Sequence, residues 1–105
     1  MRIAVVKIHN IEAGTFTEEA KNHYLFQYIE SYSGPPISLT MPVRREVYRF
    51  DTFPPYFDGV LPEGIQLEGL LKMYKVDSDD YFQQLLITGL DLVGAVTVEE
   101  IKTSS

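Results

Sequence analysis

The stretch that decides the fold is His23–Ser31, which reads HYLFQYIES. Tyr24, Phe26 and Tyr28 fall on one face of an extended chain, and the residues between them fall on the other. Side chains of a β-strand alternate between the two faces of a sheet. The alternation therefore predicts a strand over this stretch.

The chain around this stretch predicts three further short strands. Arg2–Ile8 is short and rich in β-branched residues, which is typical of a strand buried on much of both faces. A turn is predicted at Glu12–Gly14, whose glycine is able to take a positive φ. Thr15–Thr17 then returns alongside the first strand. After a break rich in proline, Ile37–Met41 is predicted to start another short strand.

The second half of the chain changes to the period of a helix. Pro54–Phe57 is predicted to open a short helix, because proline is tolerated in the first helical turn. After Pro62, apolar residues recur at i, i+3, i+4 and i+7, which predicts a second helix with one apolar stripe. The stripe consists of Leu67, Leu70, Leu71 and Tyr74.

A third helix and a closing strand complete the expected fold. Asp77 or Ser78 is expected to cap this helix, with the next two aspartates in its first turn, where the helix dipole favours negative charge. Its stripe consists of Phe82, Leu85, Leu86 and Gly89, and the glycine is the predicted stop. Val93–Val98 is predicted as the last strand. Strands, then short helices, then a closing strand predict an α+β fold with a small antiparallel sheet, as one domain over residues 1–105.

The composition excludes several classes of protein. A chain of 105 residues is too short for a two-lobed kinase, a TIM barrel or a doubly wound dehydrogenase. An apolar fraction of 45% argues against disorder, and the lack of cysteine excludes disulfides and thiolate metal sites. Neither a signal-peptide core nor an apolar run of the ~20 residues that span a membrane is present, so we expect a cytoplasmic protein.

Charge is distributed unevenly along the chain. Residues 1–50 hold six basic and five acidic residues, whereas residues 51–105 hold three basic and ten acidic ones. A net charge of −6 argues against direct nucleic-acid binding, which needs many basic side chains. The acidic half predicts either a solvated helix face or a surface steered towards a basic partner.

Side chains that carry catalysis are sparse. The two histidines, His9 and His23, lack metal-ligand spacing. Gly59 and Gly64 have the spacing of a phosphate-binding loop, but isoleucine and glutamine follow where lysine and serine or threonine are required. We therefore expect a protein that is not an enzyme and holds neither a metal nor a cofactor.

The densest feature of the sequence is Phe53–Gly64, which contains three prolines, two glycines and three aromatic residues. Proline lowers the entropy of the unfolded loop, and aromatic side chains supply contact area with few rotamers. Such a segment suits a binding surface, and it equally suits a strand-to-helix connection that plugs the core.

The same segment resembles a known family. Residues Pro55–Gly64 (PYFDGVLPEG) are similar to the P-x-F-D-G-L-L-P-E-G run in the N-terminal subdomain of HipA-type serine/threonine kinase toxins. Ile37–Pro42 (ISLTMP) resembles the I-S-L-S-x-P of that subdomain, and Asp91–Val96 (DLVGAV) resembles its D-x-V-G-A-V. The three matches keep their order along the chain.

The resemblance implies a function and partners. The chain ends soon after Val96, where HipA kinases continue into their catalytic core, so it is also similar to the stand-alone form of the subdomain, the HipS antitoxins of tripartite HipBST systems. In those systems the shortened kinase HipT lacks the subdomain. The resemblance thus implies a non-catalytic antitoxin that binds and inhibits a HipT-like kinase, with a HipB-like DNA-binding protein as a candidate further partner.

The resemblance also implies where the partner binds. The residues expected to contact the kinase are Phe57, Asp58, Leu61, Pro62, Glu63, Gly64 and Ile65. Ile65 stands where relatives can carry a tryptophan that reaches towards the kinase active site, and this chain has no tryptophan. The alternative is a scaffold that supports the kinase or tethers it to the repressor without inhibiting it.

Overall fold

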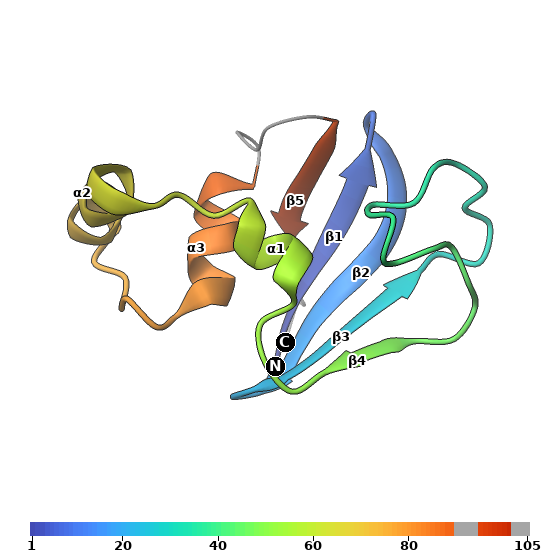
Figure 1. Cartoon of the computed structure of the whole chain (residues 1–105), viewed down its shortest axis with the longest axis horizontal. Coiled ribbons are helices and arrows are strands. Elements are labelled where there is room, and N and C mark those ends of the chain that lie inside the picture. The colour runs from blue at the N-terminus through green and yellow to red at the C-terminus, as the bar shows by residue number, and fades with distance from the viewer. Residues whose placement is uncertain (90–94, 102–105) are drawn as a thin grey trace.

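A computed structural model describes residues 1–89 and 95–101, and Figure 1 shows helices gathered on one side of a five-stranded antiparallel sheet. The strand order is β4-β3-β2-β1-β5. The elements are β1 (Arg2–Ile8), β2 (Ile11–Ala20), β3 (His23–Tyr28), β4 (Tyr48–Phe50), α1 (Pro55–Gly59), α2 (Gly64–Tyr74), α3 (Tyr81–Thr88) and β5 (Val96–Glu100). The expected α+β class is confirmed. None of the helices in this part of the chain has the length and apolar run needed to cross a membrane.

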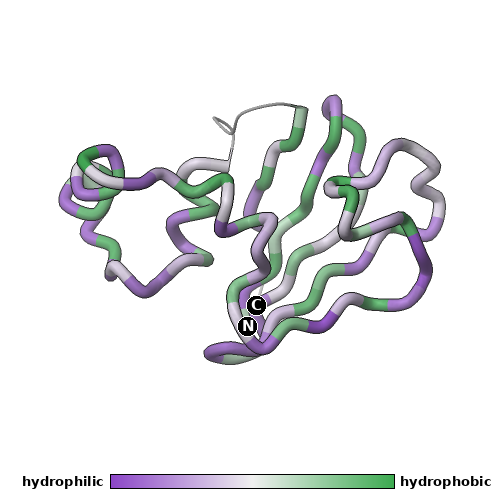
Figure 2. Tube along the Cα trace, viewed as in Figure 1, coloured by the Kyte–Doolittle hydropathy of each residue, from purple (hydrophilic) through white to green (hydrophobic). Residues whose placement is uncertain are grey.

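The sheet is built by hairpins and closed by the last strand. β1 pairs with β2, with Ala4 opposite Phe16, and β5 pairs with the other edge of β1, with Val6 opposite Val98. The aromatic face predicted for His23–Ser31 is buried, although β3 ends at Tyr28. Figure 2 shows hydrophobic residues interspersed with hydrophilic ones along the strands. Of the predicted closing strand, residues 93 and 94 lie outside the described residues.

The turn predicted at Glu12–Gly14 is wrong, because these residues lie inside β2. The hairpin turns instead at His9 and Asn10, which have φ values of 52° and 65°. Two consecutive residues with positive φ match the twist of the flanking strands, so this turn needs no glycine. Gly14 has another role, since a Cβ there would lie 2.6 Å from the backbone oxygen of Gln27.

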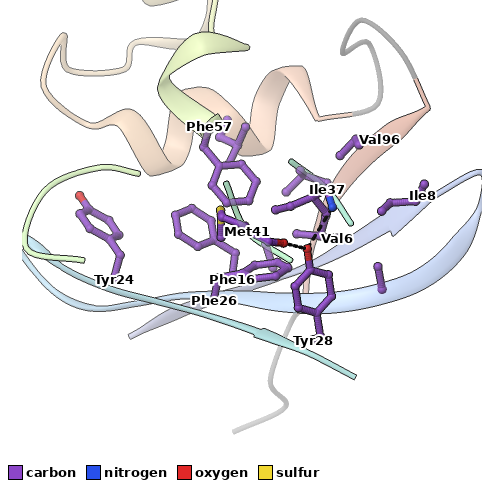
Figure 3. Packing of buried hydrophobic residues seen from close by; sticks show 14 of the residues in the cluster. Val6, Ile8, Phe16, Tyr24, Phe26, Tyr28, Ile37, Met41, Phe57 and Val96 are labelled. Atoms are coloured by element: carbon purple, nitrogen blue, oxygen red, sulfur yellow. Dashed lines mark hydrogen bonds between the residues drawn. The ribbon is translucent and has the colours of Figure 1, made fainter. Parts of the chain in front are cut away.

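The strand predicted at Ile37–Met41 is also wrong, because only an isolated bridge joins Ser38 and Met41. The segment is instead a loop that inserts Ile37 and Met41 into the core. The buried Tyr28 hydroxyl donates to the backbone oxygen of Met41 and accepts from the backbone nitrogen of Ile37 (Figure 3). Satisfying these buried backbone groups lets an irregular loop replace a strand.

Phe16 lies at the centre of the core. Its ring stacks on that of Phe57 at a centroid distance of 4.2 Å and on that of Phe82 at 5.2 Å. These contacts join the sheet to α1 and α3, and Figure 3 shows Phe57 pointing from its helix towards the sheet. The two short helices are therefore held by the aromatic layer between them and β2.

Helix α3 is fixed by ionic contacts at its beginning. Asp80, rather than Asp77 or Ser78, is the N-cap, and its side chain accepts from the backbone nitrogen of Gln83. Arg2 of β1 donates two hydrogen bonds to Asp80, of 2.8 and 3.2 Å. It donates another, of 2.8 Å, to Glu18 of β2. Asp80 therefore both caps α3 and binds Arg2 of β1, which holds the beginning of the helix against the sheet.

The end of α3 falls at Gly89, as predicted, but for a different reason. Gly89 has a right-handed φ of −58°, so it is not the left-handed stop that the sequence suggests. Its backbone oxygen accepts from the backbone nitrogen of Val98 at 2.9 Å, and a Cβ on Gly89 would lie 1.9 Å from the oxygen of Val98. The glycine is required because β5 approaches the helix end closely.

Candidate partner-binding site

Helix α1 is the base from which the candidate site extends. Pro55 occupies a first-turn position, where a missing N–H is tolerated, and the backbone nitrogen of Asp58 donates to the oxygen of Pro54 at 2.9 Å. Phe57 is fully buried against Phe16. The expectation that Phe57 contacts a partner therefore does not fit its position, because its side chain has no exposed surface. Its role is to anchor the segment that follows.

The projection, residues Asp58–Ile65, leaves this anchor and leads to α2. Asp58, Glu63 and Gly64 are exposed, and Leu61 and Pro62 are half-buried. Backbone hydrogen bonds of 3.3 Å from Val60 to Phe57 and from Leu61 to Asp58 shape its first turn. The structure thus brings six of the seven predicted contact residues together on one exposed segment.

Gly64 sets the direction in which α2 leaves the projection. Glu63 is extended, with φ −131° and ψ 164°, and Gly64 has a φ of 61°. A left-handed residue between an extended residue and a helix is accessible to glycine at no steric cost. The next residue, Ile65, is 87% exposed, so a large apolar side chain stands in solvent at the end of the predicted motif.

Helix α2 contains no buried residue. Leu67, Leu70 and Leu71 of the predicted stripe are only half-buried, and the fourth member, Tyr74, is 54% exposed. Met73 on another face is 76% exposed. Figure 1 shows α2 at the end of the molecule, farther from the sheet than α1 and α3. The helix was predicted correctly, but the domain does not bury its apolar side chains.

The charge around the projection has one sign. No lysine or arginine occurs between residues 50 and 71, whereas Asp51, Asp58, Glu63 and Glu68 are acidic. The basic side chains of the first half lie elsewhere: Arg44 stacks on the ring of Tyr48 at 3.6 Å. The projection and the part of α2 before Lys72 therefore form a surface that is both apolar and acidic, which suits a partner with basic residues around an apolar contact.

The described residues offer little for catalysis. His9 and His23 are exposed and lie in sequence near opposite ends of β2, one in or beside each of its two hairpin turns. Within residues 1–89 and 95–101, no three histidine or carboxylate side chains gather where a metal ion could bind.

Sequence reasoning missed the exposed residues of α2 beyond Ile65. The signal was present in the sequence, because Ile65, Gly69 and Met73 recur every four residues outside the predicted stripe. Together with the stripe they make α2 apolar over most of its circumference. Such a helix is typical of one that is covered on more than one side.

These features define a small α+β domain from which an apolar, acidic projection and an uncovered helix extend. The chain belongs to the HipA N-terminal domain family, whose model matches residues 4–99. This membership confirms the family resemblance. The third motif used for it, Asp91–Val96, lies mostly outside the described residues.

The chain is similar to a curated protein and to a solved structure. An uncharacterized protein of Haemophilus influenzae is 35% identical over 77 residues, which is 73% of each chain. A solved structure titled N-terminal domain of HipA toxin superposes with a TM-score of 0.77 at 27% identity, covering 99% of this chain and 96% of that one. The agreement over nearly the whole chain confirms the expected HipA N-terminal subdomain fold. Homology to this one domain fits a protein that is not an enzyme.

Proposed function

We propose that this protein is an antitoxin that binds and inhibits a HipT-like serine/threonine kinase. Membership of the HipA N-terminal domain family supports an association with toxin–antitoxin systems. In this proposal the domain replaces, in trans, the domain that the shortened kinase lacks, and it acts in the cytoplasm beside the kinase. A HipB-like DNA-binding protein is the further partner of the complex.

The observation that carries the proposal is the position of Ile65. It is 87% exposed at the end of the family motif, between an acidic projection and an uncovered helix. An exposed isoleucine gains free energy when a partner removes it from water, roughly 1.5–3 kcal/mol for complete burial. Asp58 and Glu63, exposed on either side of Leu61 and Pro62, supply the charge that steers the projection towards a basic cleft.

The inhibitory mechanism is occlusion of the kinase active site by the projection or restraint of motions that catalysis needs. Ile65 has less area than the tryptophan of some relatives and no indole N–H, so the whole projection shares the contact. A stable interface commonly buries about 800 Å² per partner, which one side of this domain can supply.

The test is a kinase assay with the Ile65→Asp variant. The variant places a charge in an apolar contact, so inhibition should weaken at least about tenfold in the concentration needed for half-inhibition. Leu39→Asp is the matched control, since Leu39 is 96% exposed but lies in the loop between β3 and β4. Equal inhibition by Ile65→Asp and wild type would remove Ile65 from the site.

The second candidate function is a scaffold that binds the kinase without inhibiting it. It is favoured by α2, which extends beyond the motif Pro55–Gly64 and contains no buried residue. Co-expression with a HipT-like kinase separates the two functions. An antitoxin abolishes the toxicity of the kinase, whereas a scaffold binds the kinase and leaves its toxicity intact.

A further inference from the structure

Helix α2 carries a line of three exposed residues, Ile65, Gly69 and Met73. Residues four apart lie above one another on a helix, so the three form one row along its surface. Ile65 and Met73 are 87% and 76% exposed, and a Cβ built on Gly69 would meet no atom within 4 Å. The row therefore presents two large apolar side chains with a gap between them.

The domain itself does not explain the glycine in this row. Glycine inside a helix is less favourable than alanine by about 1 kcal/mol. Gly14, in strand β2, and Gly89, after the end of α3, are explained by close packing, because a Cβ would lie 2.6 and 1.9 Å from backbone oxygens. Gly69 has no such neighbour and no positive φ. Its small size becomes useful only when something outside the domain approaches the helix.

The charges around the row indicate what approaches it. Glu63 and Glu68 flank the beginning of the row, and Lys72 lies beside Met73 at its end. A second copy packed in parallel would bring the same carboxylates together, and like charges in contact oppose association. A partner with lysine or arginine beside an apolar surface would be attracted instead.

We propose that the row Ile65–Gly69–Met73 receives an apolar helix of the partner, bordered by basic residues, whose side chain enters the gap at Gly69. Rows of residues four apart pack into the grooves of another helix, and the distance between the axes depends on the side chains at the contact. This inference rests on the proposed function, since the partner is the HipT-like kinase, and it extends the interface from the projection along α2.

The test compares Gly69→Ala and Gly69→Gln with wild type. Both substitutions favour the helix, so the melting temperature should stay equal or rise. Binding should weaken with side-chain size, by about tenfold or more for Gly69→Gln, because overpacking of a close contact is unfavourable. Calorimetric titration of the full-length kinase measures the affinity. The control is Leu39→Gln, at an exposed site in the loop between β3 and β4, which should bind the kinase as wild type does.

The outcomes separate the two proposals. If Gly69→Gln binds and inhibits like wild type, the helix contact is wrong and the antitoxin function stands. If wild type does not bind the kinase, both are wrong. If sedimentation shows a wild-type dimer that Gly69→Gln dissociates, the row is occupied by a second copy, which also overturns this inference.

Discussion

Two parts of the molecule expose large apolar side chains, and these two parts are held to the rest of the domain in different ways. The loop between β3 and β4, residues 29–47, exposes Leu39, whereas the projection and α2 expose Ile65 and Met73. Tyrosine hydroxyls of the loop and of the strands on either side of it donate to backbone oxygens of the loop. The pairs are Tyr28 with Met41, Tyr32 with Pro35, and Tyr48 with Pro42.

The segment from Asp58 to Tyr74 has no comparable ties. Within the part of the chain that the structure describes, none of its side chains makes a hydrogen bond. It is held at its base by the buried Phe57, and α2 buries no residue. The contrast shows that exposure alone does not mark a binding surface. The loop is stabilised by its own domain, whereas α2 is a helix whose apolar residues still lack a partner.

The largest effect is expected from removing the base of the projection. Phe57→Ala deletes a fully buried ring that stacks on Phe16, so the free energy of unfolding should fall by about 3–5 kcal/mol. Urea unfolding followed by circular dichroism measures the change. Phe57→Leu keeps most of the volume and should fold with a smaller loss. Unchanged stability of Phe57→Ala would mean that Phe57 is not the anchor and would return it to the contact surface.

A smaller loss of stability, with no change in kinase binding, is expected from a substitution that loosens the loop between β3 and β4. Tyr28→Phe removes a buried hydroxyl that bonds Ile37 and Met41, whose backbone groups then lack a partner, so stability should fall by about 1–3 kcal/mol. Burial raises the pKa of Tyr28 above its ordinary value, which agrees with a hydroxyl removed from water. Urea unfolding is again the measurement. Kinase binding should be unchanged, because the loop lies apart from α2.

The matched control is Tyr32→Phe, whose hydroxyl bonds Pro35 at the surface. Loss of a bond at an exposed position should change stability by no more than about 0.5 kcal/mol. Equal losses in the two tyrosine variants would show that the buried pair of bonds does not hold the loop.

Local patterns predicted most of the fold. The alternation along β3 is set by which side chains face the core, so it is visible in the sequence, and Gly89 marks the end of α3. The loop at Ile37–Met41 was mistaken for a strand because its buried ends look like strand residues. What fixes it is a hydroxyl from Tyr28, distant in sequence, which no local pattern contains.

The candidate site was predictable in position but not in its contacts. The composition of the projection, with proline, glycine and acidic residues, indicates an exposed segment, and the structure places Ile65 in solvent. The family resemblance covers the whole motif, so it made Phe57 an expected contact residue as well. Whether a ring faces outward or stacks on Phe16 depends on how α1 lies on the sheet. The exposure of α2 is likewise a tertiary property.

The smallest effect is expected at the ionic contact between Arg2 and Asp80, at the start of α3. Burial by itself raises the pKa of Asp80, but hydrogen bonds from Arg2 and from the backbone of Gln83 outweigh it and hold the pKa below its ordinary value of 3.8. A carboxyl with a lower pKa in the folded than in the unfolded state stabilises the fold above its unfolded-state pKa. That stability is lost as the pH falls through the folded-state pKa.

Asp80→Asn tests this contact, since asparagine keeps the cap and removes the charge. At neutral pH the variant should be less stable than wild type by less than about 1 kcal/mol, because the pair is partly exposed. The difference should shrink in urea titrations below about pH 4, where the wild-type carboxyl becomes protonated. Asp79→Asn, at an exposed neighbour, should show no difference at either pH. If the difference in stability between Asp80→Asn and wild type stays constant from neutral to acid pH, its cause is altered packing at the cap. Helix α3 would then be held on the sheet by the aromatic layer alone.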